Sequence, residues 1–282
     1  MLIEWTKDTS AIADTMIEHS SGSGGDWILQ DVMDSNHLDF EPFGVIHLPH
    51  IELFGLDISI TKHVVFMWVV AAILIITLAF VSKKYRKSLV PKGFTNFVEI
   101  IIVFIKDEIV KPTIGHGYEK FLPYLLTAFF FILLSNLFGL LPYSATVTSN
   151  IAVTGALAGM TFLMVQWGGI KSYGFFGYFR ALIPHGMPVP ILPLIIIVEI
   201  LGLFTKPFAL CIRLFANMIA GHVVILSLLG LIFIMGTVFV APVSVAFALF
   251  IYLLELLVAL IQAYIFTMLS SLFIGMAVHQ EH

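Results

Sequence analysis

Two apolar runs near the C-terminus constrain the fold of this chain most strongly. They lie at residues 190–233 and 241–278. A helix of about 20 apolar residues already crosses the hydrocarbon core of a bilayer, and each run is roughly twice that long. Each run therefore predicts a membrane helix that is strongly tilted, broken or curved. Lys206 followed by Pro207 is the expected break in the first run, because proline removes an amide donor and disfavours helix at the preceding residue.

The whole chain has the composition of a membrane protein. It has 282 residues, of which 59% are hydrophobic and 11% are charged, and its mean hydropathy is +1.02. Residues 64–82, 121–141 and 150–170 form three further segments that are long enough to cross a bilayer. Residues 94–105 are apolar but too short to span, which predicts an interfacial or re-entrant helix. We therefore predict an all-α polytopic membrane protein with about five membrane-embedded helices plus one interfacial helix, the last two membrane helices forming a long tilted hairpin.

The distribution of charge predicts the orientation of the chain. Residues 1–62 contain 11 of the 18 acidic residues and no long apolar run. Basic residues instead follow the first and third spans, at Lys83, Lys84, Arg86, Lys87, Lys171 and Arg180. By the positive-inside rule those ends are cytoplasmic. We predict an acidic extracytoplasmic N-terminal segment at residues 1–62, a membrane domain at residues 63–282 and a cytoplasmic C-terminus. Residues 47–63 alternate enough to predict a short strand or hairpin.

Polar residues interrupt the first long run at Glu199, Lys206, Arg213, Asn217 and His222. A charged side chain near the bilayer centre costs roughly 3 kcal/mol, so these groups should face water, a protein partner or each other. At about 100° per residue, the first four lie within about 40° of Arg213, whereas His222 lies on the opposite side. Such a stripe is typical of an ion path. The alternative is a buried structural ion pair, but Glu199 and Arg213 lie about 21 Å apart along a straight helix and cannot pair with each other.

The two long runs predict matched polar pairs. Residues 236–242 have the character of a tight outer turn, so antiparallel helices on either side would place Arg213 opposite Gln262 and His222 opposite Glu255. Glu255 and Gln262 lie about 20° apart on a helix and share a face. An imidazole beside a carboxylate is suited to passing protons, because it titrates near physiological pH and the carboxylate tunes it. The alternative is a buried pair that only holds the two helices together.

Several features bear on other classes of site. Cys211 is the single cysteine, which excludes an internal disulfide and a cysteine metal cluster. His47 and His50 have no nearby cysteines, so we predict no metal site. There is no nucleotide-binding glycine loop, so we predict no ATP site in this chain and no cofactor. Asn136 lies within the second span, where it either hydrogen-bonds to another helix or lines the path.

The segment RLFANMIAGH resembles the signature of subunit a of F-type ATP synthases, the membrane stator subunit beside the rotating ring. The matching residues are Arg213, Leu214, Phe215, Asn217, Met218, Ala220 and Gly221. Glu199 upstream and Gln262 downstream also stand at family-like spacing. The resemblance extends from roughly residue 60 to the C-terminus.

This resemblance implies a non-catalytic proton-path subunit in a bacterial inner (plasma) membrane. Its implied partners are a rotor ring of small hairpin subunits that each carry a membrane carboxylate, peripheral-stalk b-type subunits and the lipid bilayer, with no nucleic acid. Protons would enter from outside past Glu255 and His222 and leave past Glu199. Asn217 and Gln262 would lie along the path. Arg213 cannot release its proton, so it would keep the ring carboxylate ionised and block direct leakage between the two sides.

The chain departs from the family pattern in two ways. Gly139 and Ala209 stand where many bacterial relatives carry a polar residue, so the resemblance implies differently lined paths. Many relatives also have an acid where this chain has His222 and a histidine where it has Glu255. A secondary transporter with a charged midplane site is the alternative function, but it would predict internal repeats and discontinuous helices in both halves. A purely structural membrane anchor would leave the charged residues unexplained.

Overall fold

The computed structural model describes residues 37–40, 44–47, 52–53, 56–57, 61–85, 92–141, 144, 146–181, 192–235 and 239–279. Five helices are long and apolar enough to cross a membrane. They are α3 (Lys62–Tyr85), α6 (Leu122–Gly139), α7 (Ile151–Tyr173), α9 (Leu192–Met235) and α10 (Ala241–Val278). The prediction of an all-α polytopic membrane protein is therefore confirmed, and each span starts and ends within a few residues of its expected bounds.

Two small antiparallel hairpins precede the helices. Strand β1 (His37–Phe40) pairs with β2 (Gly44–His47), and β3 (Glu52–Leu53) pairs with β4 (Leu56–Asp57). The second hairpin falls inside the stretch for which the sequence predicts a strand or hairpin. Most of the predicted N-terminal segment lies outside the described residues, so its extracytoplasmic position stays a prediction.

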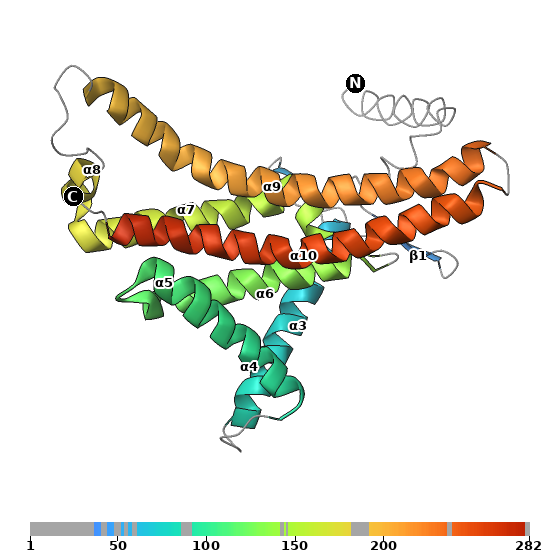
Figure 1. The fold of residues 1–282 in the computed structure, drawn as a ribbon, viewed down its shortest axis with the longest axis horizontal. Coiled ribbons are helices and arrows are strands. Elements are labelled where there is room, and N and C mark those ends of the chain that lie inside the picture. The colour runs from blue at the N-terminus through green and yellow to red at the C-terminus, as the bar shows by residue number, and fades with distance from the viewer. Residues whose placement is uncertain are drawn as a thin grey trace.

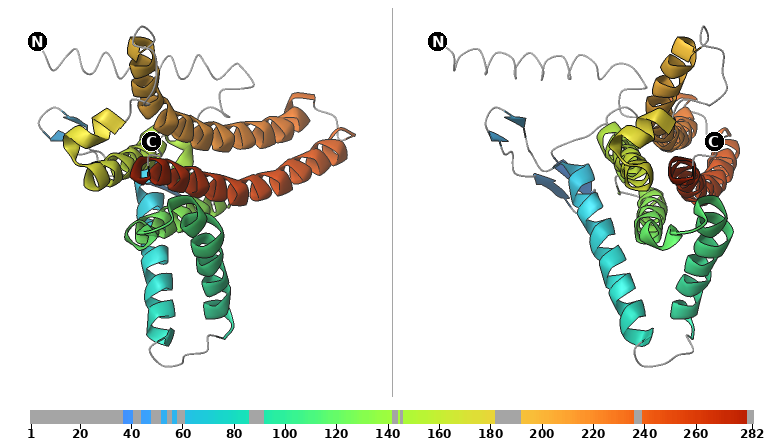
Figure 2. Two further views of the ribbon diagram at one scale, coloured as in Figure 1. Left: turned by 60° about the vertical axis from the view of Figure 1, so that its left-hand side comes forward. Right: turned by 90° about the vertical axis from the view of Figure 1, so that its left-hand side faces the viewer.

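The predicted interfacial helix is longer than the sequence indicates. Helix α4 (Phe94–Phe104) continues without interruption into a π-helical turn η1 (Ile105–Val110) and then α5 (Lys111–Ile114). The prediction that this helix ends near residue 105 is wrong. The polar residues after it stay at least partly exposed, while buried apolar side chains recur along the same segment and pack it against α6 and α10. Helices α3 and α4 extend together away from the other helices (Figures 1 and 2).

The two longest helices, α9 and α10, form the predicted hairpin and lie side by side (Figure 1). The expected break at Lys206 and Pro207 is wrong, because α9 remains one continuous helix through Pro207. It bends instead, as Figure 1 shows. A proline removes one backbone hydrogen bond, but in membrane helices neighbouring groups and local adjustment can compensate for it. Residues 236–238 of the predicted turn lie outside the described residues.

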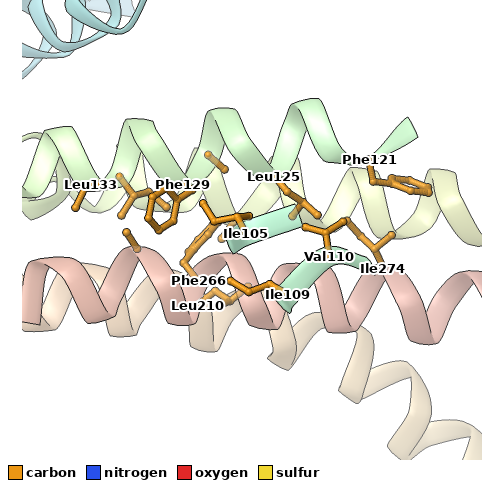
Figure 3. Close-up of a cluster of buried hydrophobic side chains, with 14 of the residues drawn as sticks. Ile105, Ile109, Val110, Phe121, Leu125, Phe129, Leu133, Leu210, Phe266 and Ile274 are labelled. Atoms are coloured by element: carbon orange, nitrogen blue, oxygen red, sulfur yellow. The ribbon is translucent and has the colours of Figure 1, made fainter. Parts of the chain in front are cut away.

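A buried apolar cluster joins α6, η1, α5, α9 and α10 (Figure 3). Its members include Leu125 and Phe129 of α6, Ile105 and Ile109 of η1 and Phe266 of α10. Lipid is as apolar as these side chains, so close packing rather than hydrophobic burial holds membrane helices together. The cluster therefore fixes α10 against α6, which is the relationship that the candidate site requires.

Short elements and small residues complete the packing. The short helices are η2 (Tyr118–Lys120), η3 (Val147–Ser149) and α8 (Phe175–Ala181). Helix α7 packs against α9: Ala158 is buried, and the Thr154 hydroxyl lies 3.5 Å from the Cys211 thiol. Cys211 is itself buried, as expected of a small apolar residue in this run. Helices α7, α9 and α10 thereby form one packed unit with α6.

Candidate functional site

His222 and Glu255 meet across the α9–α10 hairpin, as the sequence predicts. His222 Nδ1 lies 2.9 Å from Glu255 Oε1. The Glu255 side chain is 3% exposed and that of His222 is 21% exposed. A β-carbon on Gly221 would lie 2.5 Å from Glu255 Oε1, so only glycine at position 221 lets the carboxylate come this close to α9. The pair is thus a largely buried imidazole–carboxylate contact between two membrane helices.

The other ring nitrogen of His222 reaches the C-terminal end of α6. Nε2 lies 2.9 Å from Thr146 Oγ1 and 3.0 Å from the Gly139 carbonyl oxygen. Thr146 is buried and precedes η3. His222 therefore connects three parts of the fold: α9, which carries it, α10 through Glu255, and the junction between α6 and η3.

Further hydroxyl and amide groups surround this junction. The Thr148 hydroxyl donates to Asn136 Oδ1 at 2.6 Å, and the Tyr252 hydroxyl of α10 donates to the Leu140 carbonyl oxygen at 3.1 Å. Three polar atoms close to these groups in sequence or structure are buried without a partner among the described residues, namely Asn136 Nδ2, Ser135 Oγ and Glu255 Oε2. Buried polar atoms of this kind are rare in proteins and are commonly satisfied by ordered water. The end of α6 thus offers a polar lining for small polar species.

Sequence reasoning missed most of this lining. From the sequence, no role is assigned to the residues between the second and third spans, although Thr146, Thr148 and Ser149 lie there. The several serine and threonine side chains between these two membrane spans could have indicated a polar site there. Asn136 accepts its hydrogen bond from Thr148 of the short helix η3, and not from another long helix.

The sequence predicts Arg213 opposite Gln262, but Gln262 takes a different partner. Its side chain is buried, and its Oε1 accepts a hydrogen bond from Asn217 Nδ2 at 2.9 Å. Asn217 lies one turn of α9 beyond Arg213 and carries the shorter side chain. Within the described part of the chain Arg213 makes no hydrogen bond or ion pair, and its side chain is half-buried. Its guanidinium therefore has no counter-charge among the described residues.

The remaining residues of the predicted stripe lie toward the start of α9. The Lys206 ammonium lies 5.6 Å from the centre of the Phe273 ring on α10, which is within the range of a cation–π contact. Both Lys206 and Asn217 therefore contact α10, as His222 does. The sequence predicts that His222 lies on the opposite side of α9 from the stripe. It nevertheless contacts α10, as Lys206 and Asn217 of the stripe do.

Glu199 lies near a buried tyrosine of α8. Glu199 itself is exposed, while Tyr178 is 1% exposed. Burial raises the pKa of the Tyr178 hydroxyl, the negative charge of Glu199 raises it further, and a hydrogen bond with Gln166 of α7 lowers it. An exposed carboxylate at this end of α9 is thus about 21 Å along the helix from Arg213.

The described residues contain no group of three or more histidine, cysteine, aspartate or glutamate side chains that could hold a metal ion. Of the two histidines considered for such a site, His50 lies outside the described residues and His47 is described only by its backbone. His222 and Glu255 are a titratable pair that the structure brings into hydrogen-bond contact between its two longest helices.

Five apolar helices, the last two of which hold a buried imidazole–carboxylate pair between them, define a multi-pass membrane protein with a protonatable site. A family model described as the ATP synthase A chain matches residues 64–275. The protein named ATP synthase subunit a in Chloroherpeton thalassium is 56% identical over 259 residues, which cover 90% of this chain and 77% of that protein. ATP synthase subunit a 2 of Chlorobaculum tepidum is 54% identical over 258 residues, covering 90% and 73%. The chain belongs to the ATP synthase A chain family.

Proposed function

We propose that this chain is the proton-translocating stator subunit of an F-type ATP synthase, with two offset half-paths that lead to a carboxylate on the rotor ring. Membership of the family supports the stator role. The observation that carries the detail is the contact between His222 and Glu255, because it joins two groups able to exchange a proton in an otherwise apolar hairpin. The chain itself does not bind ATP; it conducts protons and the ring converts their passage into rotation.

The outer half-path runs past Glu255 and His222. Glu255 Oε2 is buried without a hydrogen-bond partner among the described residues. Leaving such an oxygen unpaired costs about 1–3 kcal/mol, more for a charged group, which favours entry of water beside it. Asn136 and Ser135 carry further unpaired polar atoms on α6. These groups favour a hydrated route that ends at the imidazole–carboxylate pair.

The inner half-path runs past Glu199 at the opposite end of α9. Its exposed carboxylate lies about 21 Å along the helix from Arg213, while His222 lies about 13 Å beyond Arg213 in the other direction. Arg213 therefore stands between the two half-paths. Since a guanidinium does not release its proton near neutral pH, it cannot relay one, and it keeps a nearby ring carboxylate ionised until that carboxylate moves on.

Arg213 is suited to this role because no group of the described chain neutralises it. Asn217 instead uses the amide of Gln262, which removes the one internal partner that the sequence suggested for the arginine. The rotor ring would supply the missing carboxylate, and peripheral-stalk b-type subunits would hold this chain against the torque. A secondary transporter expects discontinuous helices, whereas α9 and α10 are each continuous over their described lengths.

The proposed orientation in a bacterial plasma membrane places the N-terminus outside and the C-terminus in the cytoplasm. It is supported by Lys83 and Lys84 at the end of α3 and by Lys171 at the end of α7. In this orientation the α9–α10 turn and the His222–Glu255 pair lie toward the outer surface, and Glu199 lies toward the cytoplasm. Each proton that crosses would release about 2.3 kcal/mol per 100 mV of membrane potential.

The experiment that tests this function measures ATP-driven proton uptake in vesicles that hold the assembled complex, with and without sodium. We expect uptake that does not require sodium and that falls at least tenfold in a Glu255→Gln variant. Glu99→Gln is the matched control, because Glu99 is a half-buried carboxylate of the interfacial helix α4 that the proposed paths do not use. Sodium-dependent uptake, or equal uptake by both variants, would contradict the proposal.

A further inference from the structure

The hydrogen-bond partners of His222 determine which of its ring nitrogens carries a proton. Nε2 lies 3.0 Å from the carbonyl oxygen of Gly139, and a carbonyl oxygen can only accept. Nε2 must therefore be the protonated, donating nitrogen. The Thr146 hydroxyl, at 2.9 Å, can accept from the same N–H and turn its own proton toward the Gly139 carbonyl oxygen, which lies 3.4 Å away.

This assignment constrains the contact on the other side of the ring. When Nε2 carries the proton of a neutral imidazole, Nδ1 is an acceptor, and an ionised Glu255 would place a second acceptor 2.9 Å from it. The contact is favourable only when one more proton lies between Nδ1 and Oε1. The pair then holds that proton either as imidazolium with carboxylate or as imidazole with carboxylic acid. Both forms have the same proton count, so the mobile proton is the one on the Glu255 side.

We propose that Thr146 is a positioning residue for proton transfer, which together with the Gly139 carbonyl keeps His222 Nε2 protonated and so reserves Nδ1 for exchange with Glu255. The inference rests on the proposed function of the His222–Glu255 pair and adds a residue that no part of that proposal requires. Thr146 is 3% exposed, so water does not compete freely for its hydroxyl. Without the Thr146 hydroxyl, only the Gly139 carbonyl would hold Nε2–H, so the ring could turn away from α6 and adopt the tautomer that has its proton on Nδ1.

The absence of a side chain at position 139 is what allows Thr146 to reach the imidazole. A β-carbon built on Gly139 would lie 2.4 Å from Thr146 Oγ1 and 2.6 Å from Thr146 Cγ2. Real β-carbons essentially never come so close to another atom, so the threonine side chain occupies the space that a larger residue at 139 would need. The hydroxyl near Nε2 is thus provided from the loop side, by Thr146, and not from α6.

The first test compares Thr146→Val, which keeps the shape and removes the hydroxyl, with Thr146→Ser, which keeps the hydroxyl. Passive proton conduction is measured in vesicles that hold the assembled membrane sector. We expect Thr146→Val to lose at least tenfold and Thr146→Ser to stay within about threefold of the parent. Thr161→Val is the matched control, because Thr161 is equally buried and hydrogen-bonded, to Tyr124, away from the pair. Full conduction by Thr146→Val, or no rescue by serine, would overturn the proposal.

A spectroscopic measurement separates positioning from mere packing. The chain has ten histidines, so the ¹⁵N signals of His222 in the assembled complex are assigned by their loss in His222→Gln. We expect a protonated Nε2 in the parent and in Thr146→Ser, and a mixture of tautomers in Thr146→Val. An unchanged Nε2 signal in Thr146→Val would refute the inference. If His222→Gln and Glu255→Gln conduct protons normally as well, the proposed function itself fails, which is a distinguishable result.

The second test moves the hydroxyl from one side of the site to the other. Gly139→Ser alone should impair conduction, because its β-carbon meets the Thr146 side chain. Gly139→Ser combined with Thr146→Gly clears that space and places a hydroxyl in the same volume. We expect the double variant to conduct at least fivefold better than either single variant. A double variant no better than Gly139→Ser alone, in complexes that assemble normally, would show that a hydroxyl beside Nε2 is not what the site needs.

Discussion

Gln262 of α10 accepts its hydrogen bond from Asn217 of α9, and not from the arginine one turn earlier on the same helix. This contact satisfies a buried amide oxygen between the two longest helices of the chain. It also leaves Arg213 without an internal counter-charge among the described residues. The two consequences, one for stability and one for function, can be tested separately.

Replacing Asn217 with leucine should destabilise the hairpin. The substitution keeps a similar volume but leaves Gln262 Oε1 buried without a donor, and an unsatisfied buried polar group costs about 1–3 kcal/mol. Thermal unfolding of the purified subunit in detergent, followed by far-ultraviolet circular dichroism, would measure this loss. Asn217→Leu combined with Gln262→Leu removes both partners and should be more stable than Asn217→Leu alone. Equal stability of the single variant and the parent would contradict the prediction.

Replacing Arg213 with lysine should abolish coupled ATP synthesis. Lysine is shorter, lacks the planar guanidinium and releases its proton when it is desolvated, whereas arginine keeps its charge. Because no described group of the chain pairs with Arg213, its loss should leave the fold intact while the ring carboxylate loses its fixed counter-charge. Synthesis driven by an imposed proton gradient would be measured in assembled complexes. Normal ATP-driven pumping by Arg213→Lys would exclude this role.

Thiol labelling would test which surface each half-path opens to. In a chain with Cys211→Ser, a cysteine at position 199 should react with a membrane-impermeant reagent only from the cytoplasmic side. A cysteine at position 255 should react only from the outer side, and more slowly because Glu255 is buried. Ile200→Cys is the matched control, because this exposed apolar neighbour should face lipid and stay unreactive from both sides. Labelling of position 199 from the outer side alone would reverse the proposed topology.

The long helices and their pairing could be predicted from the sequence because they depend on local properties. The length of an apolar run determines whether a helix can cross a bilayer, and an antiparallel hairpin fixes which residues lie opposite each other. His222 and Glu255 were therefore placed together correctly. The same pairing rule predicts Arg213 opposite Gln262. It does not show which of two α9 residues one turn apart makes the contact, because that depends on the lengths of their side chains. Asn217, which has the shorter side chain, makes the hydrogen bond to Gln262.

What could not be predicted depends on contacts between distant parts of the chain. The π-helical turn η1 continues α4 past Ile105 because Ile109 and Val110 find buried places against other helices. Thr146 contacts His222 although 76 residues separate them, and nothing in the loop around Thr146 indicates where α9 lies. The same is true of Pro207, through which α9 continues without ending. In each case contacts with distant parts of the chain determine whether a helix continues or which residue a side chain meets.

Exchanging His222 and Glu255 tests whether proton transfer belongs to the pair. The side chains are 2.9 Å apart, so His222→Glu alone places two carboxylates together, where their like charges repel and proton exchange stalls. Glu255→His alone leaves two imidazoles and no acid. The double exchange restores one of each at the same depth. We expect each single variant to lose most proton-driven ATP synthesis and the double variant to recover a substantial part of it.

The recovery should remain incomplete, because the exchange reverses the groups that face α6. A carboxyl group at position 222 meets the Gly139 carbonyl oxygen, which repels an ionised carboxylate and favours the protonated acid. The double variant should therefore lose activity at alkaline pH sooner than the parent, because its acid must keep a proton to hold that contact. Proton-driven synthesis measured across pH in normally assembled complexes checks this. A double variant no better than the worse single variant at every pH would show that the two residues do not act as a coupled pair.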